Sequence, residues 1–251
     1  MNATRADRPI LLRVDDLRVA YGSAEVVHGV SFEIRTGEFV ALLGRNGAGK
    51  STLLHALSGL IAKRSGTVQF AAADISTATP QRIVRSGLIQ VLEGHRVFTS
   101  LSVEDNLLIG TCAPDGRADR TRLERAYALF PELAQRKDQL AARLSGGQQQ
   151  ILAVAQGIIG EPRLLILDEP SAGLAPLVIE RILEVADVLC RDGIAVLLVE
   201  QLVDKALRHA HYAYLMETGR IAGAGVPEEI RGSAALQRVY LGEHAADAGG
   251  H

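Results

Sequence analysis

A glycine-rich turn at residues 44–51 constrains the fold of this chain more than any other stretch of its sequence. An apolar run over 38–43 precedes the turn, and a helical pattern over 50–60 follows it. In a strand–turn–helix of this kind, backbone N–H groups and the positive end of the helix dipole converge on one point, where a phosphate can rest. The turn reads GRNGAGKS and fits the pattern G-x-x-x-x-G-K-[ST] at Gly44, Gly49, Lys50 and Ser51.

The polar side chains of this turn suit a nucleoside triphosphate. Lys50 supplies a full positive charge toward the β- and γ-phosphates, and the hydroxyl of Ser51 can ligate Mg²⁺. The sequence therefore predicts a loop that binds ATP together with Mg²⁺.

An acidic pair at the end of a later apolar run fits the same site. The run LLILDE ends in Asp168 and Glu169. A carboxylate at the end of a parallel strand lies at the edge of the sheet where the phosphate loop also lies. We expect Asp168 to hold Mg²⁺ and Glu169 to accept a proton from the attacking water.

The remaining pattern predicts an α/β fold. Several strands are continuous apolar runs, which is typical of a parallel sheet covered on both faces. Residues 102–159 break this alternation and contain helical patterns only. The expected helices there are 102–110, 117–130 and 148–159. The expected strands are 11–19, 26–35, 38–43, 66–70, 87–92, 164–168 and 194–200.

Composition excludes several classes of protein. The net charge of the 251 residues is −2, which favours neither nucleic acid nor an anionic membrane as a partner. The apolar runs are shorter than the roughly 20 residues that span a bilayer, and the first ten residues lack the apolar core of a signal peptide. Cys112 and Cys190 have no metal or redox spacing, so we expect free thiols in a reducing cytosol.

A second glycine-rich turn lies about a hundred residues beyond the first. It reads LSGGQ over 144–148 and opens a helical pattern, so it also offers N–H groups to an anion. Two phosphate cradles in one small chain need an explanation.

The motifs GRNGAGKST, LSGGQ and LLILDEP together resemble the ABC ATPases, the nucleotide-binding subunits of ATP-binding-cassette transporters. The resemblance implies a P-loop NTPase core with a mostly parallel sheet, an N-terminal antiparallel β subdomain and an inserted helical subdomain. It implies an ATPase domain over 11–241. Its parts are a core over 11–93 and 161–241 and a helical subdomain over about 94–160, between a tail over 1–10 and a disordered tail over 242–251.

The resemblance also explains the two cradles. In that family two subunits dimerise head to tail, and the second cradle of one subunit covers the phosphates bound by the first cradle of the other. The residues implied to act in trans are Ser145, Gly146, Gly147 and Gln148. The residues implied to bind ATP in cis are Tyr21, Gly44, Asn46, Gly47, Gly49, Lys50, Ser51 and Thr52.

Tyr21 and two histidines near the end of the chain need separate arguments. Tyr21 matches the aromatic residue that stacks on adenine, a contact worth about 1–3 kcal/mol, although a tyrosine after a strand can also be a core or surface residue. His209 and His211 have no further ligand near them in sequence, so we interpret them as surface residues rather than metal ligands.

Three departures from the family pattern concern catalysis. The family's sensor glutamine aligns with Glu93, which we expect to act at the metal and in catalysis, while Gln90 lies three residues earlier, within the predicted strand. The switch histidine aligns with Gln201, whose amide can hydrogen-bond but cannot titrate near neutral pH. The loop EPSAGLAP lacks the family's aspartate.

These departures resemble one branch of the family. The segments LEGHRVF, EPSAGLAP, VEQ and VYLG are similar to the second ATP-binding subunit of importers for branched-chain amino acids and of related urea or amide importers. The resemblance implies a cytoplasmic subunit, peripheral on the inner face of the cell membrane. Its implied partners are membrane permease subunits, a sister ATP-binding subunit or a second copy, and indirectly a periplasmic solute-binding protein, with no nucleic acid.

Some alternatives stay open at the level of sequence. Residues 93–107 are a candidate docking surface for the membrane subunits, but Val97 and Phe98 can equally be core residues. Transport in the export direction, including lipid extraction, fits the same motifs. A soluble P-loop protein acting on nucleic acid, or a kinase, is disfavoured because the chain has one cassette, no basic face and the LSGGQ motif.

Overall fold

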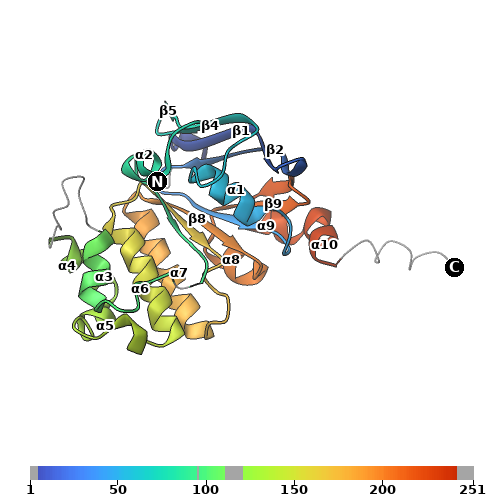
Figure 1. Cartoon of the computed structure of the whole chain (residues 1–251). Helices are drawn as coiled ribbons and strands as arrows, with labels where there is room; N and C mark the ends of the chain where they lie inside the picture. Colours follow the sequence, from blue (N-terminus) through green and yellow to red (C-terminus); the bar gives the residue numbers. More distant parts are fainter. Residues whose placement is uncertain (1–4, 95, 111–120, 242–251) are drawn as a thin grey trace.

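The strands of the computed structural model, which describes residues 5–94, 96–110 and 121–241, form two sheets (Figure 1). The antiparallel sheet has the order β2-β1-β4-β5 and contains β1 (Ile10–Tyr21), β2 (Ala24–Arg35), β4 (Ser65–Phe70) and β5 (Ala73–Asp74). The larger sheet has the order β10-β9-β3-β8-β7-β6 and contains β3 (Phe39–Leu43), β6 (Leu88–Val91), β7 (Leu164–Asp168), β8 (Ala195–Glu200), β9 (Tyr212–Glu217) and β10 (Arg220–Gly225).

The larger sheet is parallel except at β10, which pairs antiparallel with β9. Alternate residues of its central strands enter two different hydrophobic cores. In β3, for example, Phe39 and Ala41 belong to one core, and Val40 and Leu42 to the other. Burial of both faces explains the continuous apolar runs, and the predicted α/β fold with a mostly parallel sheet and an N-terminal antiparallel sheet is confirmed.

Helices cover the larger sheet, and those labelled α3 to α7 form the lower left of the molecule in Figure 1. The α-helices are α1 (Lys50–Leu57), α2 (Pro80–Arg85), α3 (Val103–Gly110), α4 (Thr121–Leu129), α5 (Pro131–Ala134), α6 (Gly146–Ile159), α7 (Pro176–Arg191), α8 (Val203–His209), α9 (Pro227–Arg231) and α10 (Ala234–Leu241). Short 3₁₀ helices lie at Arg5–Asp7 and Ala141–Arg143.

The chain between β6 and β7 contains helices and, among its described residues, no strand beyond a single bridge between Ser102 and Leu140. This agrees with the helical pattern expected over 102–159. The first residues of the helix expected over 117–130 lie outside the described residues, as do Cys112 and the tail over 242–251.

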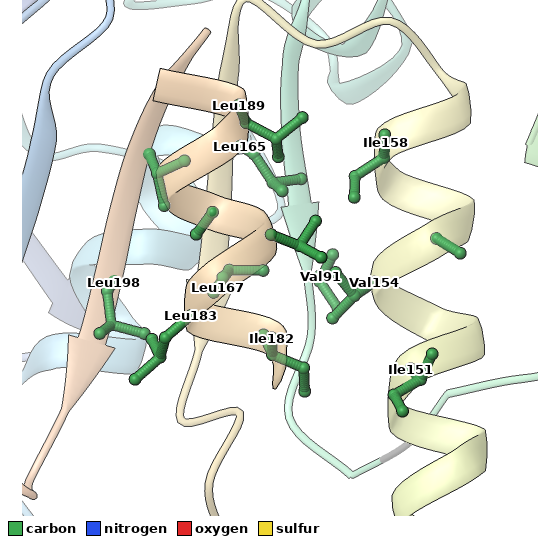
Figure 2. Close-up of a cluster of buried hydrophobic side chains, with 14 of the residues drawn as sticks. Val91, Ile151, Val154, Ile158, Leu165, Leu167, Ile182, Leu183, Leu189 and Leu198 are labelled. Atoms are coloured by element: carbon green, nitrogen blue, oxygen red, sulfur yellow. The ribbon is translucent and has the colours of Figure 1, made fainter. Parts of the chain in front are cut away.

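Apolar side chains of α6 and α7 join this helical block to the sheet. Both helices direct residues toward β6, β7 and β8, and burial of each such side chain contributes about 1.5–3 kcal/mol. Figure 2 labels ten members of the cluster, which are Val91, Ile151, Val154, Ile158, Leu165, Leu167, Ile182, Leu183, Leu189 and Leu198. The cluster fixes the start of α6, and with it the second glycine-rich turn, relative to the strand ends.

Several elements differ from the sequence expectations. The helix expected over 50–60 ends at Leu57, and β1 and β2 are longer than expected. The sequence analysis did not expect β9, β10 or α7 as separate elements. Within the described residues, no helix is both long and apolar enough to cross a bilayer.

Candidate functional site

The carboxyl ends of three neighbouring strands build the site. In the register of the larger sheet, Leu43 of β3 lies opposite Glu200 of β8, and Asp168 of β7 lies opposite Val199 of β8. The residues that follow these ends are therefore brought to one edge although they are far apart in sequence. They are the phosphate loop after β3, Glu169 after β7 and Gln201 after β8.

The phosphate loop has the backbone that its glycines predict. Gly49, the residue before α1, has φ +97°, a conformation that residues with a side chain rarely adopt. A Cβ atom at Gly44 would lie 2.4 Å from the carbonyl oxygen of Met216. Both glycines are thus required for the loop to turn directly into α1, while Asn46 and Gly47 at its crest are exposed.

Lys50 is buried at the centre of the site, with 4% of its surface exposed. Its ammonium group donates to the carbonyl oxygens of Gly44 and Arg45 at 2.9 and 3.2 Å. It also lies 3.1 Å from Oε1 of Glu169. The other oxygen of Glu169 accepts from Nε2 of Gln201 at 2.8 Å. Lys50, Glu169 and Gln201, which the sequence analysis assigned separately, are therefore one connected group.

Asp168 is buried beside this group and fits a cation. Burial, followed by the charges of Glu169 and Glu93, raises the pKa of Asp168 to about 6, against the opposing effects of Gln90 and Lys50. Its Oδ1 atom is buried and has no hydrogen-bond partner among the described residues. Ser51 lies half-buried in the first turn of α1. Carboxylate and hydroxyl oxygens are ligands that Mg²⁺ prefers, so the unpaired oxygen of Asp168 and the hydroxyl of Ser51 are the candidates for holding it.

Gln90 contributes to the site, which the sequence analysis did not expect. It lies within β6 as expected, and its amide donates to Oδ2 of Asp168 at 3.3 Å and accepts from the hydroxyl of Ser58 at 2.5 Å. Glu93 lies in the exposed turn after β6 and acts on Asp168 through its charge. The only sequence signal for this contact was a polar residue within an apolar strand. The sequence did not indicate that its side chain points to the end of the neighbouring strand.

Two other residues near the site were missed by the sequence analysis. Glu200, the last residue of β8, is buried and accepts hydrogen bonds from the backbone of Ser171 and Gln201. Tyr240 of α10 lies near the phosphate loop: burial raises its pKa to about 12, opposed by the backbone of Gly44 and assisted by Glu200 and Glu169. A lone glutamate at the end of an apolar strand was the only sequence signal for the first of them.

The second glycine-rich turn begins α6. The hydroxyl of Ser145 accepts from the backbone of Gln148 at 3.3 Å, and the side chain of Gln148 accepts from the backbone of Ser145 at 3.0 Å. This capping box leaves Ser145 and Gly146 on an exposed helix N-terminus, which favours an anion. Within the described residues, no hydrogen bond or ion pair joins this turn to Lys50 of the same chain.

The other predicted residues divide between surface and core. Tyr21 is 51% exposed at the end of β1, and Thr52 is half-buried in α1. Phe98 is 53% exposed, whereas Val97 packs against the core. The interpretation of both histidines as surface residues is wrong for His209. Its side chain is only 12% exposed, pairs with Asp187 at 2.7 Å and lies against Phe39.

His211 is exposed, as expected, although its ring is engaged. Its Nδ1 atom accepts from the backbone N–H of Phe39 at 3.0 Å. Desolvation and the nearby Arg8 lower the pKa of His211. His95, within the segment LEGHRVF, lies outside the described residues.

A phosphate loop with a buried lysine, an acidic pair and an amide at adjoining strand ends defines a P-loop nucleotide hydrolase. The chain belongs to the ABC transporter family, whose model matches residues 27–172. It is therefore an ATP-hydrolysing, ATP-binding subunit of an ABC transporter, a class that dimerises and works with membrane permease subunits.

Relatives of known name extend over most of the chain. The chain is 39% identical to the high-affinity branched-chain amino acid transport ATP-binding protein BraG of Pseudomonas aeruginosa, over 92% of this chain and 100% of that protein. It is 32% identical to the lipopolysaccharide export system ATP-binding protein LptB of Escherichia coli K12, over 92% and 97% of the two chains. Among solved structures, it is similar to the ADP conformation of MJ1267, an ATP-binding cassette of an ABC transporter, with a TM-score of 0.83 and 26% identity, over 94% and 100% of the two chains.

Proposed function

We propose that this chain powers an importer of branched-chain amino acids or of a related small solute. The observation that carries the proposal is its similarity to BraG along that protein's whole length, at higher identity than to LptB. In this proposal the chain is cytoplasmic and peripheral on the inner face of the membrane. A periplasmic solute-binding protein delivers the solute to the permease subunits.

We assign the chemistry to the group around Lys50. Arriving phosphates take Lys50 from Glu169, because a triphosphate carries more negative charge than one carboxylate. Glu169 is then free to accept a proton from the attacking water, held in place by Gln201. Ser51 and Asp168, with Glu93 nearby, would hold Mg²⁺, which when bound neutralises charge on the phosphates.

The ATP site in this proposal is shared between two chains. Tyr21 stacks on the adenine in cis, Asn46, Gly47 and Thr52 complete the cradle, and the partner's 145–148 turn covers the γ-phosphate. The exposure of Ser145 and Gly146, and the absence of any bond from this turn to Lys50 within the described chain, support sharing.

The docking surface for the permease subunits is proposed around Phe98. The buried Asn106 accepts from the backbone N–H of Phe98 at 2.8 Å and donates to its carbonyl oxygen at 2.9 Å. These bonds hold a loop in which an aromatic ring stays exposed while Val97 is anchored in the core. An exposed aromatic ring on a fixed backbone is suited to contact a partner.

Two other functions remain as candidates. The similarity to LptB favours an export or lipid-extraction ATPase as the second. A urea or amide importer is a variant of the first, since the motifs of the two branches are shared.

Reconstitution with its own membrane subunits tests the proposal. The chain is purified together with the membrane proteins that bind it, and the complex is placed in proteoliposomes. We expect ATP-dependent uptake of radiolabelled leucine or valine that requires an added solute-binding protein and is lost with Lys50→Ala. Uptake of urea alone would identify the complex as a urea importer instead. Lipid extraction without solute uptake would contradict import.

A further inference from the structure

Glu200 is an unusual residue for its position. It ends β8, a strand whose other residues are apolar and buried, and only 5% of Glu200 is exposed. Burying a carboxyl group is costly unless its oxygens are hydrogen-bonded. Both oxygens are used here: Oε1 accepts from the backbone N–H of Ser171, and Oε2 accepts from that of Gln201, each at 3.1 Å.

These two bonds hold two residues that are close to Glu169, one along the chain and one through a side-chain contact. Ser171 lies two residues after Glu169 in the loop that follows β7, and Gln201 donates its side-chain amide to Glu169 at 2.8 Å. The contacts therefore close a ring through Glu169, Gln201, Glu200 and Ser171. The ring joins the ends of β7 and β8 through side chains, just beyond the point where the strand ladder stops.

Glu169 needs such support because its backbone is strained. Its φ is +43°, in the left-handed region that residues with a side chain adopt at a cost. Its own N–H donates to the carbonyl oxygen of Val199 at 3.0 Å, which fixes one side of the residue. The bond from Ser171 to Glu200 fixes the other side.

The carboxyl group suits this task better than other side chains. A glutamine would offer one acceptor and would turn an N–H donor toward one of the two backbone N–H groups. An alanine would leave both N–H groups without this partner. An aspartate is one methylene shorter and reaches less far from the end of β8.

We propose that Glu200 is a positioning residue for ATP hydrolysis, which clamps the backbone of Ser171 and Gln201 and thereby holds Glu169 and Gln201 at their working distance. The inference rests on the proposed role of Glu169 as general base. Glu200 itself touches no reacting atom in this account. Its effect on turnover passes through Glu169.

The first test separates turnover from binding. In Glu200→Gln we expect kcat for ATP to fall about tenfold, with KM and the equilibrium affinity for ATP within twofold of the wild type. Glu200→Ala should lower kcat further, and Asp204→Asn, which removes an exposed carboxylate at the start of α8, should leave kcat unchanged. A kcat within twofold of wild type in Glu200→Gln would overturn the proposal. A loss of kcat matched by an equal loss of ATP-binding stoichiometry would also overturn it. That pattern reports unfolded protein, so Glu200 would support the fold as a whole rather than the position of Glu169.

The second test asks whether Glu200 acts through Glu169. Single-turnover hydrolysis of radiolabelled ATP is compared between Glu169→Gln and the double variant Glu169→Gln/Glu200→Gln. We expect equal rates, because the positioned group is already absent. A further tenfold loss in the double variant would show that Glu200 acts independently, which overturns the inference. Full turnover in Glu169→Gln alone would instead overturn the assignment of the general base, so the two failures are distinguishable.

Discussion

The ammonium nitrogen of Lys50 lies 3.1 Å from a carboxylate oxygen of Glu169, so the two residues to which phosphate binding and proton removal are assigned are paired with each other. Both are largely buried, with 3% and 14% of their side chains exposed. Bound phosphates would compete with Glu169 for Lys50. Nucleotide binding and release of the base are then the same event.

Replacement of Glu169 by glutamine tests this competition. Glu169→Gln keeps the shape but removes the base and its charge, so we expect kcat to fall at least about a hundredfold. ATP should bind at least as tightly as to the wild type, because Lys50 loses its competing carboxylate. Phosphate release and equilibrium nucleotide binding measure the two effects. Turnover reduced less than about tenfold would remove Glu169 as the base, and weaker ATP binding would contradict the competition.

Gln201 predicts a flat pH profile for hydrolysis. An amide does not titrate, so kcat of the wild type between about pH 6 and 8 should show no transition that depends on this residue. Gln201→Ala should lower kcat by removing the 2.8 Å bond to Glu169, without changing the profile's shape. Gln201→His should introduce a transition within this range. A transition in the wild type that Gln201→Ala abolishes would contradict this account.

Asp168 predicts a pH-dependent stability in protein free of nucleotide and Mg²⁺. Its folded pKa of about 6 lies above the ordinary value of 3.8, so the folded state binds the proton more tightly and stability falls as the pH rises from about 4 through 6. Asp168→Asn stays neutral and should unfold with a larger free energy at pH 8, by about 2–3 kcal/mol. Urea unfolding at several pH values measures the difference in the free energy of unfolding between the wild type and Asp168→Asn. The difference should shrink toward zero near pH 4; a wild type more stable at pH 8 would refute the prediction.

The start of α6 has little room for a side chain at Gly147. A Cβ atom there would lie 2.9 Å from Cγ2 of Val178 on α7. Gly147→Ala should therefore destabilise the protein by about 1–3 kcal/mol and lower turnover by shifting the 145–148 turn. Val178→Ala makes room, so the double variant Gly147→Ala/Val178→Ala should recover part of both losses. Thermal melting measures the stability, and ATPase rates measure the turnover. A Gly147→Ala variant with the stability and turnover of the wild type would contradict the packing argument.

The parts of the site that are contiguous in sequence could be predicted. The phosphate loop and the LLILDE strand could be predicted because their residues act beside one another along the chain, and the apolar runs predicted a sheet buried on both faces. Gln90 and Glu200 could not be predicted, because their places depend on which strand ends the register brings together. Tyr240 could not be predicted because it reaches the phosphate loop from α10, a helix far from that loop in sequence.

Other differences have local physical causes. The strand β10 reads RIAGAG, and its small residues give a weak strand pattern, so it was missed. His209 looked like a surface residue, yet the partner that buries it, Asp187, lies on α7, which was itself not expected.

The central claim is that the two glycine-rich turns act on one ATP from different chains. Mixing Lys50→Ala with Ser145→Arg tests it most directly, under conditions where co-purification of differently tagged variants shows mixed dimers. Each variant alone has two defective sites, whereas a mixed dimer has one site with both lesions and one intact. We predict that mixing restores hydrolysis to at most about half the wild-type rate. If mixed dimers form and no activity returns, the shared site is contradicted.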